Sequence, residues 1–144
     1  MRLVLDNEHL NQHFFEDTRL LGIIAPIKNY QFCWQLNNSL GFSFWLNPDI
    51  EIHLKKKQRS YFFPVYQSNE ANTSIIHYVY HNIFDGEYLL PEFKHIDYLW
   101  LIKGEYIEDE TCNWIKQSIK NINGVQLVTE LTNEQIKNKG NMIF

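Results

Sequence analysis

The stretch GEYLLPEFKHIDYLWLIKG, from Gly86 to Gly104, contains the strongest strand pattern of this chain. Side chains alternate between the two faces of a strand, so residues 96–103 are predicted to present two sets of side chains. The first set is Ile96, Tyr98, Trp100 and Ile102, and the second is Asp97, Leu99 and Leu101. Both sets are mainly apolar, which is typical of a strand in the middle of a sheet with both faces covered.

Asp97 is the odd residue of this strand, because a buried carboxylate destabilises the fold unless hydrogen-bond donors reach it. In one interpretation, Asp97 accepts hydrogen bonds from backbone N–H groups and fixes the register of the strand. In the other, Asp97 forms an acid/base pair with His95, and Glu92 lies nearby. We favour the structural interpretation, since no nucleophile or metal-ligand spacing accompanies the pair. Tyr98, on the opposite face, is predicted to anchor the core beneath a helix.

The run LPEFKHIDY, from Leu90 to Tyr98, resembles the signature of the IPExxxVDY family, a bacterial group of small proteins of unassigned function. The residues that match the signature are Pro91, Glu92, Asp97 and Tyr98, whereas Leu90 and Ile96 replace its Ile and its Val. The run YQFCWQLN, residues 30–37, is similar to the first helix of that family. The resemblance covers nearly the whole chain. It implies no catalytic roles, because the family has no established activity.

The composition indicates one domain spanning residues 1–144. The hydrophobic fraction of 44% and the aromatic fraction of 15% exclude a disordered chain. The net charge of −4 gives no general attraction to nucleic acid. The N-terminus lacks the apolar run of a signal peptide, and no apolar run approaches membrane-spanning length, so we expect a cytoplasmic protein that does not associate with membranes.

Two segments, residues 27–40 and residues 108–122, show the apolar spacing of amphipathic helices. The stripe of the first is Phe32, Leu36 and Leu40, and the stripe of the second is Cys112, Ile115, Ile119 and Ile122. Gly41 is suited to end the first helix. Acidic residues fill the first turn of the second helix, an arrangement that the helix dipole favours.

Three residues of these helices invite a functional interpretation. Trp34 points off the apolar stripe, and we expect it to pack under a neighbouring loop rather than to bind a partner. Cys33 and Cys112 are expected to be buried free thiols, since no CxxC motif is present; a disulfide would need the two distant positions to meet in the fold. A nucleophilic role for Cys33 with a distant His would require a lowered thiol pKa, and nothing in the sequence would lower it.

Residues 41–103 form a run of strand patterns without helices between them, which predicts an antiparallel meander. Asn47-Pro48-Asp49 is predicted to turn the chain between two strands. Pro64 places the strand over residues 61–67 at an edge of the sheet or at a bulge, and an exposed edge predicts a homodimer. In the strand over residues 75–82, one side is predicted to carry Ile75, His77, Val79 and His81.

Two further strands flank this run. Gly22, inside the strand over residues 20–24, indicates either close approach of another backbone segment or a bulge. The last strand covers residues 125–131, with Val125, Leu127 and Leu131 on one face. The fold class is therefore α+β, a mainly antiparallel sheet with two principal helices packed on it. The order of helix, glycine, valine and strand near the end is similar to ferredoxin-like modules.

The best pattern for nucleic-acid binding is a basic loop followed by aromatic residues. The basic residues are Lys55, Lys56, Lys57 and Arg59, and the aromatic ones are Tyr61, Phe62, Phe63 and Tyr66. Aromatic side chains on a sheet can stack bases while a basic loop holds phosphates. A charged hairpin tip between apolar strands is also an ordinary protection against aggregation, and the acidic total charge favours that interpretation.

The histidines do not form a metal site by sequence. His77 and His81 are four residues apart, which on a strand separates them by about 13 Å, too far for shared coordination. His9 and His13 lack an accompanying Cys or acidic pattern. No sequence motif of a hydrolase, nucleotide-binding loop, dinucleotide fold, metalloprotease or zinc finger is present, and no cofactor is expected.

The sequence thus favours a non-enzymatic binding or interaction module, acting on an unknown protein partner or small ligand. RNA or single-stranded DNA binding through the basic loop is one alternative. The other is an enzyme that uses Asp97, His95 and Glu92.

Overall fold

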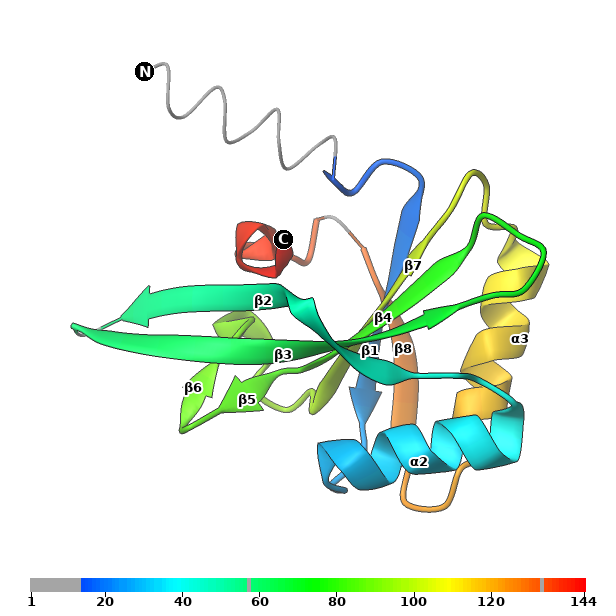
Figure 1. Ribbon diagram of the computed structural model, residues 1–144, viewed down its shortest axis with the longest axis horizontal. Helices are drawn as coiled ribbons and strands as arrows, with labels where there is room; N and C mark the ends of the chain where they lie inside the picture. Colours follow the sequence, from blue (N-terminus) through cyan, green and yellow to red (C-terminus); the bar gives the residue numbers. More distant parts are fainter. Residues whose placement is uncertain (1–13, 57, 133) are drawn as a thin grey trace.

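The computed structural model describes residues 14–56, 58–132 and 134–144. Within these residues, six strands form one antiparallel sheet in the order β2-β3-β4-β7-β1-β8. Their bounds are β1 Thr18–Ile24, β2 Trp45–Lys56, β3 Arg59–Asn69, β4 Ile76–His81, β7 Tyr98–Lys103 and β8 Leu127–Leu131. The helices are α2 (Asn29–Leu40) and α3 (Asp109–Lys120). The predicted α+β class, with two helices and a mainly antiparallel sheet, is confirmed (Figure 1).

The connections combine a meander with a crossover. Strands β2, β3, β4 and β7 pair in sequence order. A small hairpin of β5 (Ile83–Phe84) and β6 (Glu87–Tyr88) interrupts the meander before β7. Strands β7 and β8 are both antiparallel to β1, which lies between them, so β7–α3–β8 is a split βαβ unit of the ferredoxin-like kind.

Both helices cover the same face of the sheet (Figure 1). Their predicted stripes are confirmed: Phe32, Leu36, Cys112, Ile115 and Ile119 are buried there. Helix α2 ends as expected at Gly41, which adopts the left-handed conformation with φ 77°. Cys33 and Cys112 are buried free thiols, also as predicted.

The opposite face of the sheet packs under the short 3₁₀ helix η2 (Lys139–Met142) and the segment around η1 (Pro91–Phe93). Ile96 belongs to this layer with Leu99 and Leu101, so its predicted place beside Tyr98 is wrong. The reason is that β7 begins at Tyr98, and the alternation of a strand does not extend back to Ile96. Figure 1 shows η2 and α2 on opposite sides of the sheet.

Two predictions about the outer strands are wrong. Asn47-Pro48-Asp49 is not a turn between strands but a bulge within β2, where the register shifts between Leu46 and Glu51. The buried Asn47 holds this bulge, because its Oδ1 accepts the Asp49 N–H at 2.9 Å. Of the two positions predicted for Pro64, the edge is wrong, since β3 pairs with β2 and β4. Pro64 pairs with Glu51, where the bulge of β2 ends. The edges of the six-stranded sheet are β2 and β8.

The predicted faces of two further strands are confirmed in β4 and partly wrong in β8. The alternation in β4 is confirmed, with Val79 towards the helices and Tyr80 towards η2. In β8 the prediction is wrong for Val125, which packs in the helix-covered layer, whereas Leu131 packs in the other. The observed strand starts later than the predicted one, at Leu127, so the alternation does not extend back to Val125. His9 and His13 lie outside the described residues.

Candidate functional site

Asp97 lies at the corner where β7 begins, between the ends of β1 and β4. Its Oδ2 accepts the backbone N–H of Ala25 at 2.8 Å. Its own N–H donates to Ile23 O at 2.8 Å, and its carbonyl accepts the N–H of Asn82 at 2.8 Å. Asp97 therefore ties three segments together through both its backbone and its carboxylate.

Glu92 lies in η1 and holds the C-terminal segment. Its Oε2 accepts the backbone N–H groups of Lys137 at 2.6 Å and Asn138 at 2.7 Å, and its Oε1 accepts Asn138 Nδ2 at 2.8 Å. Burial alone would raise the pKa of the Glu92 carboxyl. The hydrogen bonds from Asn138 and the nearby backbone N–H groups have the larger combined effect, so this pKa is lowered. Glu92 and Asp97 thus have separate partners.

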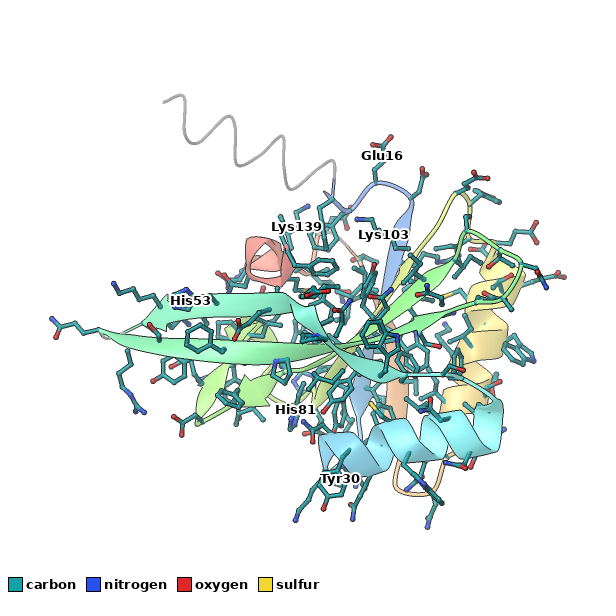
Figure 2. All side chains as sticks on the ribbon, viewed as in Figure 1. Glu16, Tyr30, His53, His81, Lys103 and Lys139 are labelled. Atoms are coloured by element: carbon teal, nitrogen blue, oxygen red, sulfur yellow. The ribbon has the colours of Figure 1, made fainter. Side chains whose placement is uncertain are left out.

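The structure shows no hydrogen bond or ion pair among Asp97, His95 and Glu92, the residues of the predicted acid/base group. His95 is exposed, and no hydrogen bond or ion pair of the described residues includes it. The ring that does lie near Asp97 is His81, which stacks on Tyr98 with centroids 4.7 Å apart. Burial lowers the pKa of His81, and the charge of Asp97 opposes this shift. His81 points from β4 towards the α2 side of the sheet (Figure 2).

We expect Asp97→Ala to lower the free energy of unfolding by about 1–3 kcal/mol, because it leaves the Ala25 N–H without its acceptor. Denaturant unfolding of both proteins would measure the difference. Asp97→Asn is the matched control: its amide oxygen can still accept this bond, so it should cost less. Unchanged or increased stability of Asp97→Ala would instead favour a functional role, since site residues are often unfavourable for stability.

We expect the stabilising effect of Glu92 to depend on pH. A carboxyl whose pKa is lower in the folded state contributes stability that is present above its unfolded-state pKa. That contribution is lost as the pH falls through the folded-state pKa. The difference in unfolding free energy between the native protein and Glu92→Gln should therefore be largest near pH 7 and shrink below about pH 4. A difference independent of pH in chemical denaturation would contradict the prediction.

The basic hairpin does not assemble the predicted nucleic-acid surface. Lys56 Nζ lies 3.3 Å from Glu87 Oε1, and Arg59 Nη2 lies 3.0 Å from Asp85 Oδ2, so acidic residues of the β5–β6 hairpin pair with these cations. Lys57 lies outside the described residues. Tyr61 and Phe63 are buried in the core and present no face for stacking a base. The exposed Phe62 already stacks on His53 of β2, with centroids 4.6 Å apart.

The outer face of α2 carries the feature that the sequence interpretation missed. Trp34 is 65% exposed and Tyr30 59% exposed, so the prediction that Trp34 packs under a loop is wrong. Figure 2 shows Tyr30 projecting from α2 away from the sheet. The residues of α2 include no charged side chain. The signal was present in the sequence, because an aromatic residue off the buried stripe of a helix that covers a sheet must face outward.

The remaining histidine, His77, is buried in β4 on the helix-covered face. Its Nδ1 accepts the indole N–H of Trp100 at 3.0 Å. Within the described residues, no group of three His, Cys, Asp or Glu side chains is placed to hold a metal ion. No helix in that part of the chain is both long and apolar enough to cross a membrane.

Comparison with known proteins gives no relative: no family model, no curated protein and no solved structure matches the chain. The resemblance of residues 90–98 to the IPExxxVDY signature therefore stays a prediction.

Proposed function

We propose that this protein is a non-enzymatic interaction module that inserts Tyr30 and Trp34 of α2 into an apolar groove of a partner protein. The observation that carries the proposal is a helix face with two large exposed aromatic rings and no charge. The centres of protein interfaces are enriched in Trp and Tyr and depleted in charged residues. A spacing of four residues is also how a helix presents its anchors to a groove.

The chemistry of α2 argues against other occupants. A nucleic acid needs cations that contact its phosphates, and α2 contains no Lys or Arg. The shallow groove between the rings is lined by Tyr30, Gln31, Trp34 and Gln35. All four belong to one helix, which alone cannot surround a small molecule as ligand pockets do. The partner must therefore supply the pocket.

We expect Trp34→Ala to weaken binding of such a partner by at least about 2 kcal/mol, roughly 30-fold in Kd, because the ring is the larger of the two anchors. Capture from native lysate should be run in parallel with the native chain, Trp34→Ala and the control Tyr106→Ala. Tyr106 is also highly exposed but precedes α3. A protein retained by the native chain and the control but lost with Trp34→Ala is then purified and its Kd measured by calorimetry.

Equal affinity of Trp34→Ala and the native chain for the purified partner would contradict the proposal. If the α2 face instead binds a second copy of this chain, the partner is the protein itself. A homodimer was predicted from an edge at residues 61–67, but the edges lie at β2 and β8. Light scattering that gives the mass of two chains for the native protein and one chain for Trp34→Ala would assign the α2 face to self-association.

Nucleic-acid binding and enzymatic activity, the two alternative functions, predict different experimental results. A salt-sensitive gel shift that is lost on replacing Lys55, Lys56 and Lys57 would favour RNA or single-stranded DNA binding. Turnover abolished by Asp97→Asn in a folded protein would favour an enzyme. We further propose a reducing, cytoplasmic location, which the buried free thiols support.

A further inference from the structure

A cavity of about 270 Å³ lies on the helix-covered side of the sheet, away from the exposed face of α2. The end of α2, the loop between β3 and β4 and the first half of α3 form its walls. The lining residues that matter here are Phe42, Ser68, Glu70, His77, Thr111 and Trp114. The volume is slightly below that of pockets for drug-sized molecules, so it suits a molecule with a single ring.

The largely buried side chain of His77 presents a donor to this cavity. The side chain is 2% exposed, and its Nδ1 accepts the Trp100 indole N–H, so a neutral ring carries its proton on Nε2. Burial lowers the pKa of His77 to about 4, which keeps the ring neutral at physiological pH. Glu70 Oε2 lies 3.7 Å from Nε2, too far for a hydrogen bond, and no other described residue accepts from it. Among the described residues, no fully buried side-chain N or O atom lacks a hydrogen-bond partner, so the Nε2–H without an acceptor must reach the open space of the cavity.

Two other polar groups stand beside it. The carboxylate of Glu70, whose side chain is 45% exposed, offers acceptor oxygens. The buried Ser68 accepts the Ser43 N–H at 3.0 Å, and its own O–H donates to none of the described residues. The rest of the lining is largely apolar. The Phe42 ring is edge-on to His77, with ring centroids 5.2 Å apart, and Trp114 lines the cavity from α3.

We propose that this cavity binds a small uncharged molecule in which a carbonyl oxygen lies next to an N–H group, such as a primary carboxamide or a lactam on a planar ring. The carbonyl accepts the His77 Nε2–H, and the N–H donates to the Glu70 carboxylate. The lining contains no Lys or Arg, and Glu70 repels an anion. A purely donating cation offers nothing to the His77 N–H. The proposal goes beyond the partner surface on α2 and does not depend on it.

Three probes that share a ring and differ in the polar group test this assignment on the full chain. Benzamide offers the acceptor and the donor, benzoate only acceptors with a negative charge, and benzamidine only donors with a positive charge. NMR titrations follow the His77 imidazole and the Trp114 indole. We expect benzamide to shift both signals and to bind at least about tenfold more tightly than benzoate and benzamidine, the effect of one mismatched charged hydrogen bond.

The variants Glu70→Ala and Trp114→Ala should keep the fold, since both positions are partly exposed. We expect Glu70→Ala to weaken benzamide about tenfold, while Glu51→Ala, on β2, leaves it unchanged. Trp34→Ala should also leave it unchanged, which separates this site from the α2 face. Absence of shifts at His77 and Trp114, benzoate or benzamidine binding as tightly as benzamide, or unaltered affinity in Glu70→Ala would each overturn the proposal.

Discussion

We expect Tyr98→Ala to lower the free energy of unfolding by about 3–5 kcal/mol, the cost of truncating a large buried aromatic ring. Tyr98 is fully buried on β7, between the sheet and α2. The centroid of its ring lies 4.5 Å from the ring centroid of Phe32 on α2, and the ring is stacked on His81. Alanine would leave a cavity that the rigid sheet cannot fill, because the strands on both sides of β7 fix its position. Denaturant unfolding with a comparison of m-values would measure the loss.

Tyr98→Phe separates packing from hydrogen bonding. It keeps the ring and removes only the hydroxyl, which donates to the carbonyl oxygen of Ile27 just before α2. We expect this variant to cost about 0.5–1.5 kcal/mol. A loss below about 1 kcal/mol for Tyr98→Ala would show that Tyr98 does not anchor this layer. Equal losses in the two variants would assign the effect to the hydrogen bond alone.

The layers of the fold were predictable where apolar spacing is regular. The stripes of α2 and α3 and the alternation in β4 follow from the periods of a helix and a strand, and the structure confirms them. Where the chain leaves regular geometry, the same rule fails. Ile96 precedes β7, and it packs on the face opposite to Tyr98. The Asn47-Pro48-Asp49 segment has the sequence of a turn, but it forms a bulge, and β2 continues on both sides of it.

Long-range partners could not be predicted in the same way. A partly buried carboxylate at Asp97 needs a donor, but the sequence does not say that the donor is the Ala25 N–H, 72 residues earlier. The edge at β2 follows from a strand order that local patterns do not contain. The sequence predicts only the side of the strand on which His77 lies. Only the fold shows that Trp100 fixes its proton on Nε2 and that a cavity lies beside it.

We expect Gly22→Ala to lower the free energy of unfolding by about 3 kcal/mol, the upper end of the cost of overpacking a core. Gly22 pairs with Leu99 of β7 and Thr129 of β8, so β1 is fixed on both sides. A Cβ atom at this position would lie 2.6 Å from Ile96 Cδ1 and 3.2 Å from Leu131 Cδ1. Both neighbours are buried and cannot turn away into solvent.

Ile96→Val tests this cause, because it removes only the Cδ1 methyl group that would meet the new Cβ. Alone, Ile96→Val should cost about 0.5–1.5 kcal/mol. Combined with Gly22→Ala, it should cost at least about 1 kcal/mol less than the sum of the two single changes, as expected for residues in contact. The recovery is partial, since Leu131 still crowds the site. Additive losses in the double mutant would show that the close approach of Ile96 is not what requires glycine at position 22.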